Sequence, residues 1–395
     1  MRTITNQDFS NLRAIVRVDF NVPINDQFQV TDSTRIKAAK ETIDYILNHG
    51  GSCVLISHLG RPKGKDPKLS LSHIVSKVEE ILQVPVNFFD DCVGAGAEHA
   101  AASISPGTVI LMENLRFYKE ETAGDLHFAE GLSKLGDCYV NDAFGTAHRA
   151  HASTTIISKF FNEEKFFGRL LEKEVNAIEK VMKSGEKPVL AILGGAKVSS
   201  KITIIENLLD KIDHLIIGGG MVYTFVKAQG GSVGRSICED EYCDYALELL
   251  EKAKIKGVQL HLPVDIIVAD NFSNNANQKV CKVDEIPNDW EGLDAGPQTL
   301  KNFEDVVMQS KTILWNGPLG VFEFKNFSSG TVTLGEHIAK STASGAFSLV
   351  GGGDSVAAVK QFGLEEKMSY ISTGGGAMLE SLEGKALPGI AALME

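Results

Sequence analysis

The sequence shows none of three patterns that would each indicate a protein class: long apolar runs, a basic excess and a secretory signal pattern in its first residues. No stretch reaches the roughly 18 uninterrupted apolar residues that a membrane-spanning helix needs. The first ten residues, MRTITNQDFS, contain neither the basic nor the apolar part of a secretory signal. The net charge of −12 argues against a general nucleic-acid binder. We therefore expect a cytoplasmic protein without membrane or nucleic-acid partners.

Paired cysteines are also missing. No C-x-x-C motif is present, and two of the six cysteines fall in apolar, strand-like runs where a small buried thiol is usual. A disulfide, metal or redox role is the alternative to this interpretation. The six are Cys53, Cys92, Cys138, Cys238, Cys243 and Cys281.

Two common nucleotide-binding motifs are absent as well. The chain has no G-x-x-x-x-G-K-[ST] loop, which disfavours a P-loop fold, and no G-x-G-x-x-G dinucleotide fingerprint. A nucleotide site, if there is one, must be built from other glycine-rich segments.

The 395 residues instead show short apolar runs that alternate with helical patterns, and the length favours two domains. This alternation predicts βαβ units with mainly parallel sheets covered on both faces. Predicted helices include 34–48, 71–82, 200–209, 242–256 and 331–340. Predicted strands are 14–20, 53–57, 85–89, 108–113, 138–143, 188–193, 213–218, 262–269, 311–316, 346–351 and 368–372.

An amphipathic helical pattern separates the two series of strands. In Gly168–Ser184, apolar residues recur at helical spacing, and Gly185 and Pro188 follow it. We interpret this segment as a linker helix whose ends serve as hinges, with an ordinary surface helix of one domain as the alternative.

Strands of the first half end in charged clusters. Residues 1–170 hold 18 Lys+Arg and 21 Asp+Glu, a net charge of −3, against 21 and 30, or −9, for the remainder. Arg17, Asp19 and Asn21 alternate in a predicted strand, so they are expected on one face. Arginine forks suit carboxylates and phosphates, although each alone could be an ion-paired surface residue. Several together predict a small ligand with more than one negative group; the cations are Arg35, Arg61, Arg116 and Arg149.

Strands of the second half end in glycine. Lys197 and Lys201 lie four residues apart where a helix is predicted to start, so they are expected to share a face and reach a polyphosphate. Gly351–Ser355 opens another predicted helix, and its Asp354 suits a Mg²⁺ carried by a nucleotide. Glu323 is either a ribose ligand or a solvated acid. Tight turns alone are the alternative explanation for the glycines.

Ten motifs, in order, resemble the phosphoglycerate kinase family. In the first half they are RVDFNVP (17–23), SHLGRP (57–62), ENLRF (113–117) and NDAFGTAHRAHAS (141–153). In the second half they are LGGAKVSSKI (193–202), IIGGGM (216–221), GLDAGP (292–297), NGPLGVFE (316–323), GGGDS (351–355) and STGGGAMLE (372–380). Ser33 and Ser355 stand where the family often has Asp and Thr.

The resemblance implies an α/β fold of two Rossmann-like three-layer α/β/α domains joined by a helix. The implied divisions are 1–169 for 3-phosphoglycerate, 170–185 for the linker helix, 186–380 for the nucleotide, and 381–395 for a tail packing back on the first domain. The implied substrate-binding residues are Asp19, Phe20, Asn21, Arg35, His58, Leu59, Gly60, Arg61, Arg116 and Arg149. The implied nucleotide-binding residues are Gly195, Lys197, Lys201, Gly219, Gly292, Asn316, Glu323, Gly351, Gly352, Gly353, Asp354 and Ser355, with Mg²⁺ at Asp354.

The implied reaction passes the acyl phosphate of 1,3-bisphosphoglycerate to ADP, giving 3-phosphoglycerate and ATP, reversibly. In the direction that forms the acyl phosphate, the attacking group is a carboxylate, so no general base is required. Catalysis then consists of positioning the substrates and neutralising charge. Arg35, Lys197 and Lys201 are assigned to neutralisation, with domain closure about the linker helix excluding water. Nothing in the sequence requires an oligomer.

Two rival functions follow from the same patterns. A nucleotide-dependent dehydrogenase on two similar domains is disfavoured by the missing dinucleotide fingerprint. A non-catalytic sensor that closes around phosphorylated metabolites would not need the paired lysines together with Asp354.

Overall fold

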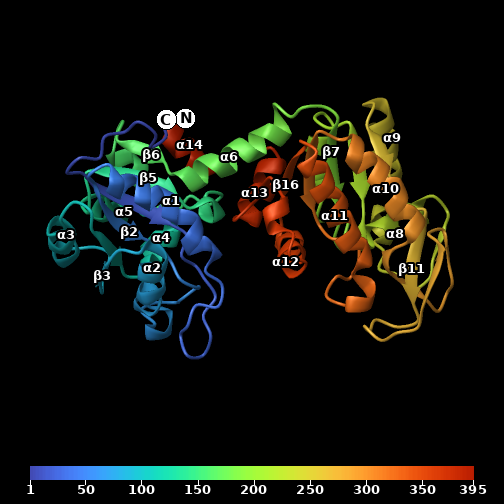
Figure 1. Ribbon diagram of the computed structural model, residues 1–395, viewed down its shortest axis with the longest axis horizontal. Coiled ribbons are helices and arrows are strands. Elements are labelled where there is room, and N and C mark those ends of the chain that lie inside the picture. Colours follow the sequence, from blue (N-terminus) through green and yellow to red (C-terminus); the bar gives the residue numbers. More distant parts are fainter. The chain divides into compact units, whose positions relative to one another are not determined.

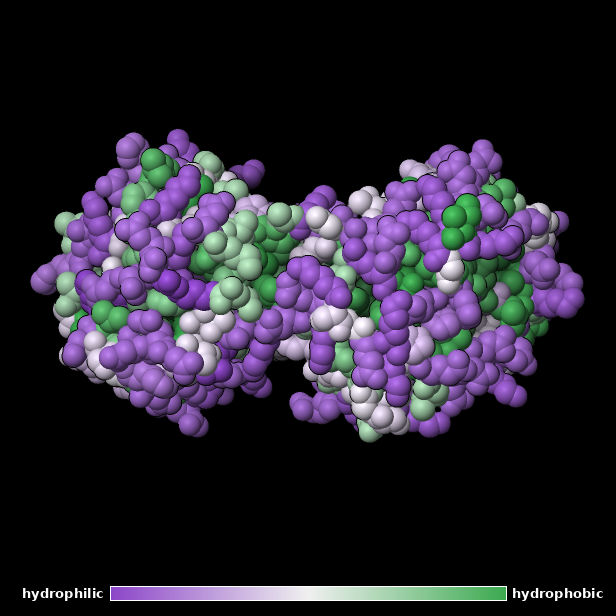
Figure 2. Space-filling view, turned by 90° about the horizontal axis from the view of Figure 1, so that it is seen from above, coloured by the Kyte–Doolittle hydropathy of each residue, from purple (hydrophilic) through white to green (hydrophobic).

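A computed structural model describes all 395 residues, which divide into two compact units. Unit 1 contains Met1–Val175 and Ala386–Glu395, and unit 2 contains Asn176–Lys385. The last helix, α14 (Pro388–Met394), therefore belongs to unit 1, where Gly389 N donates to Ala147 O at 2.8 Å. None of the helices is both long and apolar enough to cross a bilayer. Figure 2 shows a largely hydrophilic surface on the face in view.

Unit 1 is built on a six-stranded, wholly parallel sheet in the order β3-β4-β2-β1-β5-β6. Figure 1 draws most of this unit in blue to green and labels β2, β3, β5 and β6 of the sheet. Its strands are β1 (Arg13–Val18), β2 (Ser52–Ile56), β3 (Val86–Phe89), β4 (Val109–Met112), β5 (Cys138–Asp142) and β6 (Lys165–Phe167). Its other helices are α1 (Thr34–Asn48), α2 (Val75–Leu82), α3 (Ala95–Ala102), α4 (Lys119–Ala123) and α5 (Leu126–Ser133).

The period of two along β1 gives the two faces of this sheet different neighbours. Ala14, Val16 and Val18 join the core cluster that also contains the buried residues of α1 and α2. Arg17 lies on the alternate face, because successive side chains of a strand point to opposite sides. This alternation directs a cation into the half of the unit that also holds α4 and the segment after β5.

Unit 2 contains a second six-stranded parallel sheet, in the order β10-β8-β7-β15-β16-β17. Its strands are β7 (Val189–Leu193), β8 (His214–Ile217), β10 (Gln259–His261), β15 (Thr312–Asn316), β16 (Phe347–Val350) and β17 (Tyr370–Ile371). Its helices are α7 (Ile202–Leu208), α8 (Val222–Ala228), α9 (Cys243–Ile255), α10 (Pro297–Gln309), α11 (Ser329–Ala343), α12 (Gly353–Gln361) and α13 (Gly375–Leu382).

A separate antiparallel sheet of three strands, in the order β12-β11-β14, completes unit 2 with the short parallel pair β9 and β13. The strands are β9 (Ser232–Val233), β11 (Asp265–Ala269), β12 (Gln278–Lys282), β13 (Glu285–Ile286) and β14 (Glu291–Ala295). The predicted strand 262–269 lies here rather than in a parallel sheet. The sequence of β12, QKVCK, is charged and mostly exposed, so no apolar run marked it.

Helix α6 (Arg169–Met182) covers most of the segment that we predict to be a linker helix, and the division between the units falls within it. Its apolar stripe is buried at Leu171, Ile178 and Val181. At its start, Asp142 Oδ1 accepts hydrogen bonds from Leu170 N at 2.9 Å and Leu171 N at 3.2 Å. A buried carboxylate thus satisfies backbone donors of the first turn, which have no partner within the helix.

Candidate active site

In unit 1, most of the predicted substrate-binding side chains follow the carboxyl ends of neighbouring parallel strands. Asp19 and Asn21 follow β1, His58 and Arg61 follow β2, and Arg116 follows β4. Arg149 lies in the segment after β5, and Arg35 lies in the first turn of α1. Because the strands are parallel, these ends meet at one edge of the sheet, where ligands of open α/β sheets bind.

The expectation that Arg17, Asp19 and Asn21 share one strand face was wrong. Strand β1 ends at Val18, so Asp19 and Asn21 lie in the following loop. Arg17 is fully buried, and its Nε donates to Ser153 Oγ at 2.9 Å. The strand ends because backbone pairing with β2 and β5 stops there.

Hydrogen bonds join the loops into one rigid edge. Arg35 Nη1 donates to the backbone oxygen of Asn21 at 2.9 Å and to Asp19 Oδ1 at 3.3 Å. Asn21 Oδ1 accepts from Gly60 N at 2.8 Å, and Arg116 Nη1 donates to Gly60 O at 2.8 Å. The loops after β1, β2 and β4 are thereby held in fixed register before any ligand binds.

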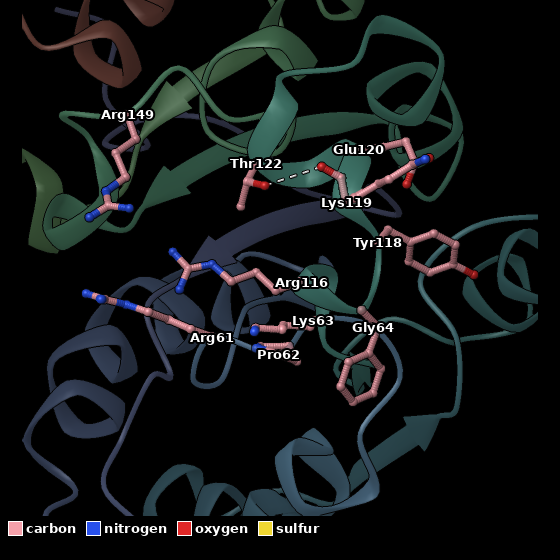
Figure 3. Close-up of a pocket in the computed structure, with 11 residues that line it drawn as sticks. Arg61, Pro62, Lys63, Gly64, Arg116, Tyr118, Lys119, Glu120, Thr122 and Arg149 are labelled. Carbon is pink, nitrogen blue, oxygen red and sulfur yellow. Dashed lines mark hydrogen bonds between the residues drawn. The ribbon is translucent and has the colours of Figure 1, made fainter.

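A pocket of about 560 Å³ opens beside this edge. Figure 3 shows the guanidinium groups of Arg61, Arg116 and Arg149 gathered at one end of it, although they come from three separate segments. Lys63 and Lys119 also line the pocket, and Glu120 is its one acid. So many cations around one small cavity suit a ligand with several negative charges.

The local electrostatics show how concentrated this positive charge is. Burial, with the neighbouring charges of Arg17 and Arg149 acting in the same direction, lowers the pKa of Arg116 to about 10. Burial also lowers the pKa of His58 well below 6.5, with Arg17, Arg116 and Arg35 acting in the same direction. Because burial and mutual repulsion destabilise these positive charges, binding of an anion at this site is favourable.

Of the predicted substrate set, only Arg61, Arg116 and Arg149 line this pocket. The other seven do not: Asp19, Phe20, Asn21, Arg35, His58, Leu59 and Gly60. Phe20 and Leu59 are buried in the apolar core. Phe20 N donates to Ser57 Oγ at 2.9 Å, and Leu59 N donates to Asn114 Oδ1 at 3.2 Å. Their observed contacts hold the loop in shape.

In unit 2, the glycine-rich segments follow β7, β8, β16 and β17, which all belong to one parallel sheet. A second pocket, of about 480 Å³, lies among them and carries five of the predicted nucleotide-binding residues. These are Gly195, Gly219, Gly292, Glu323 and Asp354. The rest of its wall is largely apolar and includes Tyr223, Ile237, Phe272, Leu293, Leu319 and Phe322. An apolar slot beside a carboxylate and glycine-rich turns suits a flat base joined to a phosphate chain.

The prediction that Lys197 and Lys201 share a helical face was wrong. Helix α7 begins at Ile202, so Lys201 is its N-cap residue and Lys197 lies in the preceding loop. Lys201 Nζ donates a hydrogen bond to Asn316 Oδ1. Burial lowers the pKa of Lys201, whereas the nearby charge of Asp354 raises it.

Asn316 and Ser355 are held at the ends of β15 and α12. Asn316 Nδ2 donates to the backbone oxygen of Gly351 at 2.8 Å. Ser355 Oγ, which is fully buried, accepts from Gly317 N at 2.6 Å. Gly352 has a φ of +90°, and a Cβ there would lie 2.6 Å from Asn316 Nδ2, so only glycine fits this turn. Gly353 then begins helix α12.

A divalent cation would have one protein ligand in this unit. The chain contains no group of three or more His, Cys, Asp or Glu side chains able to hold a metal ion by themselves. Asp354 is exposed, lines the pocket and lies in the first turn of α12. One carboxylate fits Mg²⁺ when phosphates supply most other ligands.

Comparison with known proteins decides the family. The phosphoglycerate kinase family model matches residues 4–385. The phosphoglycerate kinase of Porphyromonas gingivalis is 54% identical, with 99% of both chains covered. That of Synechococcus elongatus is 50% identical, covering 100% of this chain and 98% of its relative. The chain belongs to the phosphoglycerate kinase family. The solved phosphoglycerate kinase of Coxiella burnetii superposes with a TM-score of 0.91 at 41% identity, covering 99% of this chain and 98% of that one.

Membership of the phosphoglycerate kinase family confirms the predicted fold class and the predicted phosphotransferase activity. The sequence reasoning missed two groups around the two candidate pockets. The apolar wall of the unit 2 pocket comes from loops and carries no charge or glycine pattern. Glu121 lies between the pocket-lining residues Glu120 and Thr122 and contacts Ser153 and His151. Ser153 and His151 fall inside a motif that was identified, but the sequence of that motif does not show which residues its side chains contact.

Proposed function

We propose that unit 1 binds 3-phosphoglycerate or 1,3-bisphosphoglycerate and that unit 2 binds MgADP or MgATP. The support for the first site is the convergence of Arg61, Arg116 and Arg149 on one pocket. A phosphate and a carboxylate on one small ligand match such a set of guanidinium groups. The second site is supported by its glycine-rich turns and apolar slot beside Asp354.

The proposed reaction moves a phosphoryl group between a carboxylate of phosphoglycerate and the terminal phosphate of the nucleotide. The attacking carboxylate is already ionised at neutral pH, so no residue has to remove a proton. Arg35, Lys197 and Lys201 neutralise the charge that spreads over the transferring group. When bound, Mg²⁺ would neutralise nucleotide phosphate charge, with Asp354 as its protein ligand.

The chemistry also requires that water stay away from the acyl phosphate. Because the two substrates bind in different units, we propose that a hinge motion about α6 brings them together for transfer. The amphipathic α6, anchored at its start by Asp142, suits a stiff connecting element.

We further propose that the enzyme acts in the cytoplasm as a monomer. All six cysteines are free thiols, as is usual in a reducing compartment. Relatives include bacterial and cytosolic proteins, and a chloroplastic one. Each of the two candidate pockets is lined by residues of a single unit.

A coupled assay tests the proposed substrates. ATP consumption by the purified chain should require both 3-phosphoglycerate and Mg²⁺, and hydroxylamine should trap the acyl phosphate product as a hydroxamate. The 2-phosphoglycerate isomer is the matched control, since it moves the phosphate away from its place among the arginines. Equal turnover with both isomers, or ATP consumption without either, would contradict the proposal.

A further inference from the structure

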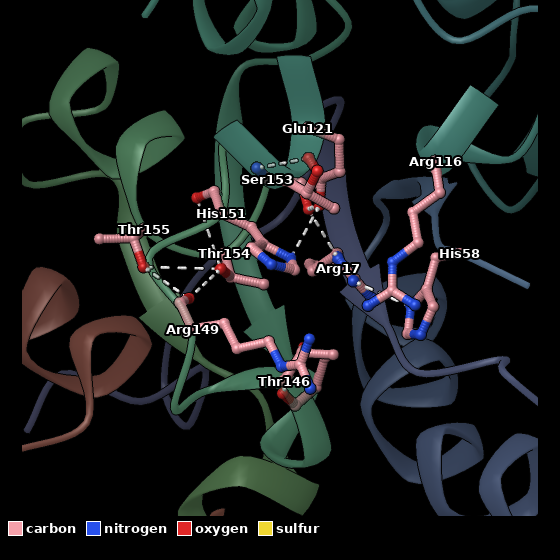
Figure 4. Close-up of polar contacts among 12 residues, drawn as sticks. Arg17, His58, Arg116, Glu121, Thr146, Arg149, His151, Ser153, Thr154 and Thr155 are labelled. Atoms are coloured by element: carbon pink, nitrogen blue, oxygen red, sulfur yellow. Dashed lines mark hydrogen bonds and ion pairs between the residues drawn. The ribbon is translucent and has the colours of Figure 1, made fainter. Parts of the chain in front are cut away.

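Figure 4 shows a buried chain of hydrogen bonds, drawn together with Arg116 and Arg149 of the cationic pocket of unit 1. Glu121, in α4, is fully buried, and its Oε1 accepts from Ser153 Oγ at 2.6 Å. Its Oε2 accepts from Ser153 N at 3.0 Å. Ser153 Oγ in turn accepts from Arg17 Nε at 2.9 Å. A guanidinium only donates, so the serine hydroxyl passes its own hydrogen on to the carboxylate.

Arg17 carries this chain on to His58. Arg17 Nη1 donates to the backbone oxygen of Val18 at 2.5 Å, and Nη2 lies 3.2 Å from His58 Nδ1. Because Arg17 has no acceptor, Nδ1 must accept the hydrogen bond, which places the ring hydrogen on Nε2. The low pKa of His58, caused by burial and then by the positive charge of Arg17, is consistent with a neutral ring.

Other partners do not replace Glu121 in this arrangement. His151 Nδ1 lies 3.8 Å from Glu121 Oε1, beyond hydrogen-bond distance. Burial lowers the pKa of His151 to about 4, so at neutral pH it brings no positive charge to Glu121. Asp19 Oδ1 is 4.0 Å from His58 Nδ1 and is engaged by Arg35. The buried charge of Arg17 is therefore linked by hydrogen bonds to one carboxylate, that of Glu121.

We propose that Glu121 is a positioning residue of the substrate site. Acting through Ser153 and Arg17, it fixes the neutral form of His58 with its hydrogen on Nε2, so that the ring presents one N–H donor to the anionic substrate. Glu121 itself touches no substrate. This inference rests on the proposed function, in which His58 binds phosphoglycerate.

The proposal predicts a specific kinetic defect. In a Glu121→Gln variant, Arg17 loses its compensating charge and His58 Nδ1 loses a fixed donor, so the ring samples both tautomers. The KM for 3-phosphoglycerate should rise roughly 10-fold to 100-fold, as for one lost hydrogen bond to a charged group. The KM for ATP should stay within about twofold, because the nucleotide pocket lies in the other unit.

The tautomer can be observed directly. In protein labelled with ¹⁵N-histidine, the His58 ring resonances are assigned by their loss in His58→Gln. Wild type and the control Glu130→Gln, which changes an exposed acid of α5, should show an unprotonated Nδ1 and a protonated Nε2. Glu121→Gln should show averaged shifts of the two nitrogens.

A second variant keeps the test decisive if Glu121→Gln does not fold. Ser153→Ala removes the hydroxyl that joins Glu121 to Arg17 and should reproduce both effects. When both single variants fold, their combination should be no worse than either, because they interrupt one path. Unchanged KM for 3-phosphoglycerate and unchanged His58 resonances in whichever variants fold would overturn the proposal. Failure of the proposed function looks different, since His58→Gln itself would then leave that KM unaltered.

Discussion

Nη1 of Arg35 lies 3.3 Å from the carboxylate of Asp19. Arg35 belongs to the first turn of α1, where the helix dipole makes a cation electrostatically unfavourable. The Arg35 side chain remains 35% exposed, against 7% for Asp19. Asp19 and the backbone oxygen of Asn21 therefore anchor the guanidinium through one nitrogen, Nη1, while the side chain stays partly exposed. This anchoring fixes the direction of the guanidinium, and its partial exposure leaves the positive charge accessible to an anion.

Arg35→Ala should therefore lower kcat by about 100-fold to 1000-fold or more, as expected for loss of a charge-stabilising donor. The fold should survive, because Arg35 is partly exposed and its two partners are a loop acid and a backbone oxygen. Steady-state kinetics and thermal unfolding check this, with Arg2→Ala as control for the loss of an exposed cation. Near-normal turnover would remove Arg35 from the catalytic set.

Asp354→Ala should separate the two binding sites. The affinity for MgADP should fall about 10-fold or more, the scale of one lost charge-assisted contact, while 3-phosphoglycerate binding changes little. Calorimetric titration of each ligand measures this. Asp305→Ala, which removes an exposed acid from α10, is the matched control. Equal losses for both ligands would contradict the assignment of the nucleotide to unit 2.

The elements that the sequence predicted well are those with strong periodicity. Helix α1 matches its predicted bounds of 34–48, and every parallel strand with a buried apolar run was found. Short or exposed strands such as β6 and β12 were not, because their residues lack such a run. The predicted helix 71–82 opens with a 3₁₀ turn at Leu71–Ile74, a local tightening that spacing does not encode.

For the candidate site, residue identity was more informative than geometry. Strand ends placed Arg61, Arg116 and Arg149 correctly around one pocket, because parallel strands share an edge. The role of Arg17 could not be foreseen, since it depends on Ser153, 136 positions away. The prediction that Lys197 and Lys201 share a helical face was wrong because the helix starts after both residues. Long-range partners and exact helix starts are set by packing, which the sequence pattern leaves open.

Gly292→Ala should weaken nucleotide binding through a steric conflict in the pocket wall. A Cβ at Gly292 would lie 2.0 Å from Tyr223 Oη and 2.5 Å from Tyr223 Cζ, and Tyr223 is buried. Removing the hydroxyl alone therefore leaves the clash, so Tyr223→Phe should not restore affinity in the Gly292→Ala background. Tyr223→Leu, which removes the ring edge, should restore part of it. Titration with ADP compares Gly292→Ala with the two double variants and with wild type. Equal affinity in all of them would show that the pocket wall rearranges to accommodate the added methyl group.

The carboxyl group at the start of α6 should make folding stability depend on pH. Asp142 is fully buried, its Oδ2 has no hydrogen-bond partner, and burial raises its pKa from 3.8 to about 7. A folded-state pKa above the unfolded value means that the group's stabilisation is complete below about pH 4 and lost as pH rises through about 7. Asp142→Asn keeps an oxygen for Leu170 N and Leu171 N but cannot ionise.

The free energy of unfolding of Asp142→Asn, relative to wild type, should therefore increase between pH 4 and 8 by about 1–4 kcal/mol. Urea unfolding at several pH values measures this difference and cancels the other titrating groups. Asp137→Asn is the opposing control, because hydrogen bonding to Arg13 lowers the pKa of Asp137, so its stabilisation is lost only at acid pH. A difference for Asp142→Asn that stays flat from pH 4 to 8 would mean that the carboxylate stays ionised, held by the N–H groups that open the helix.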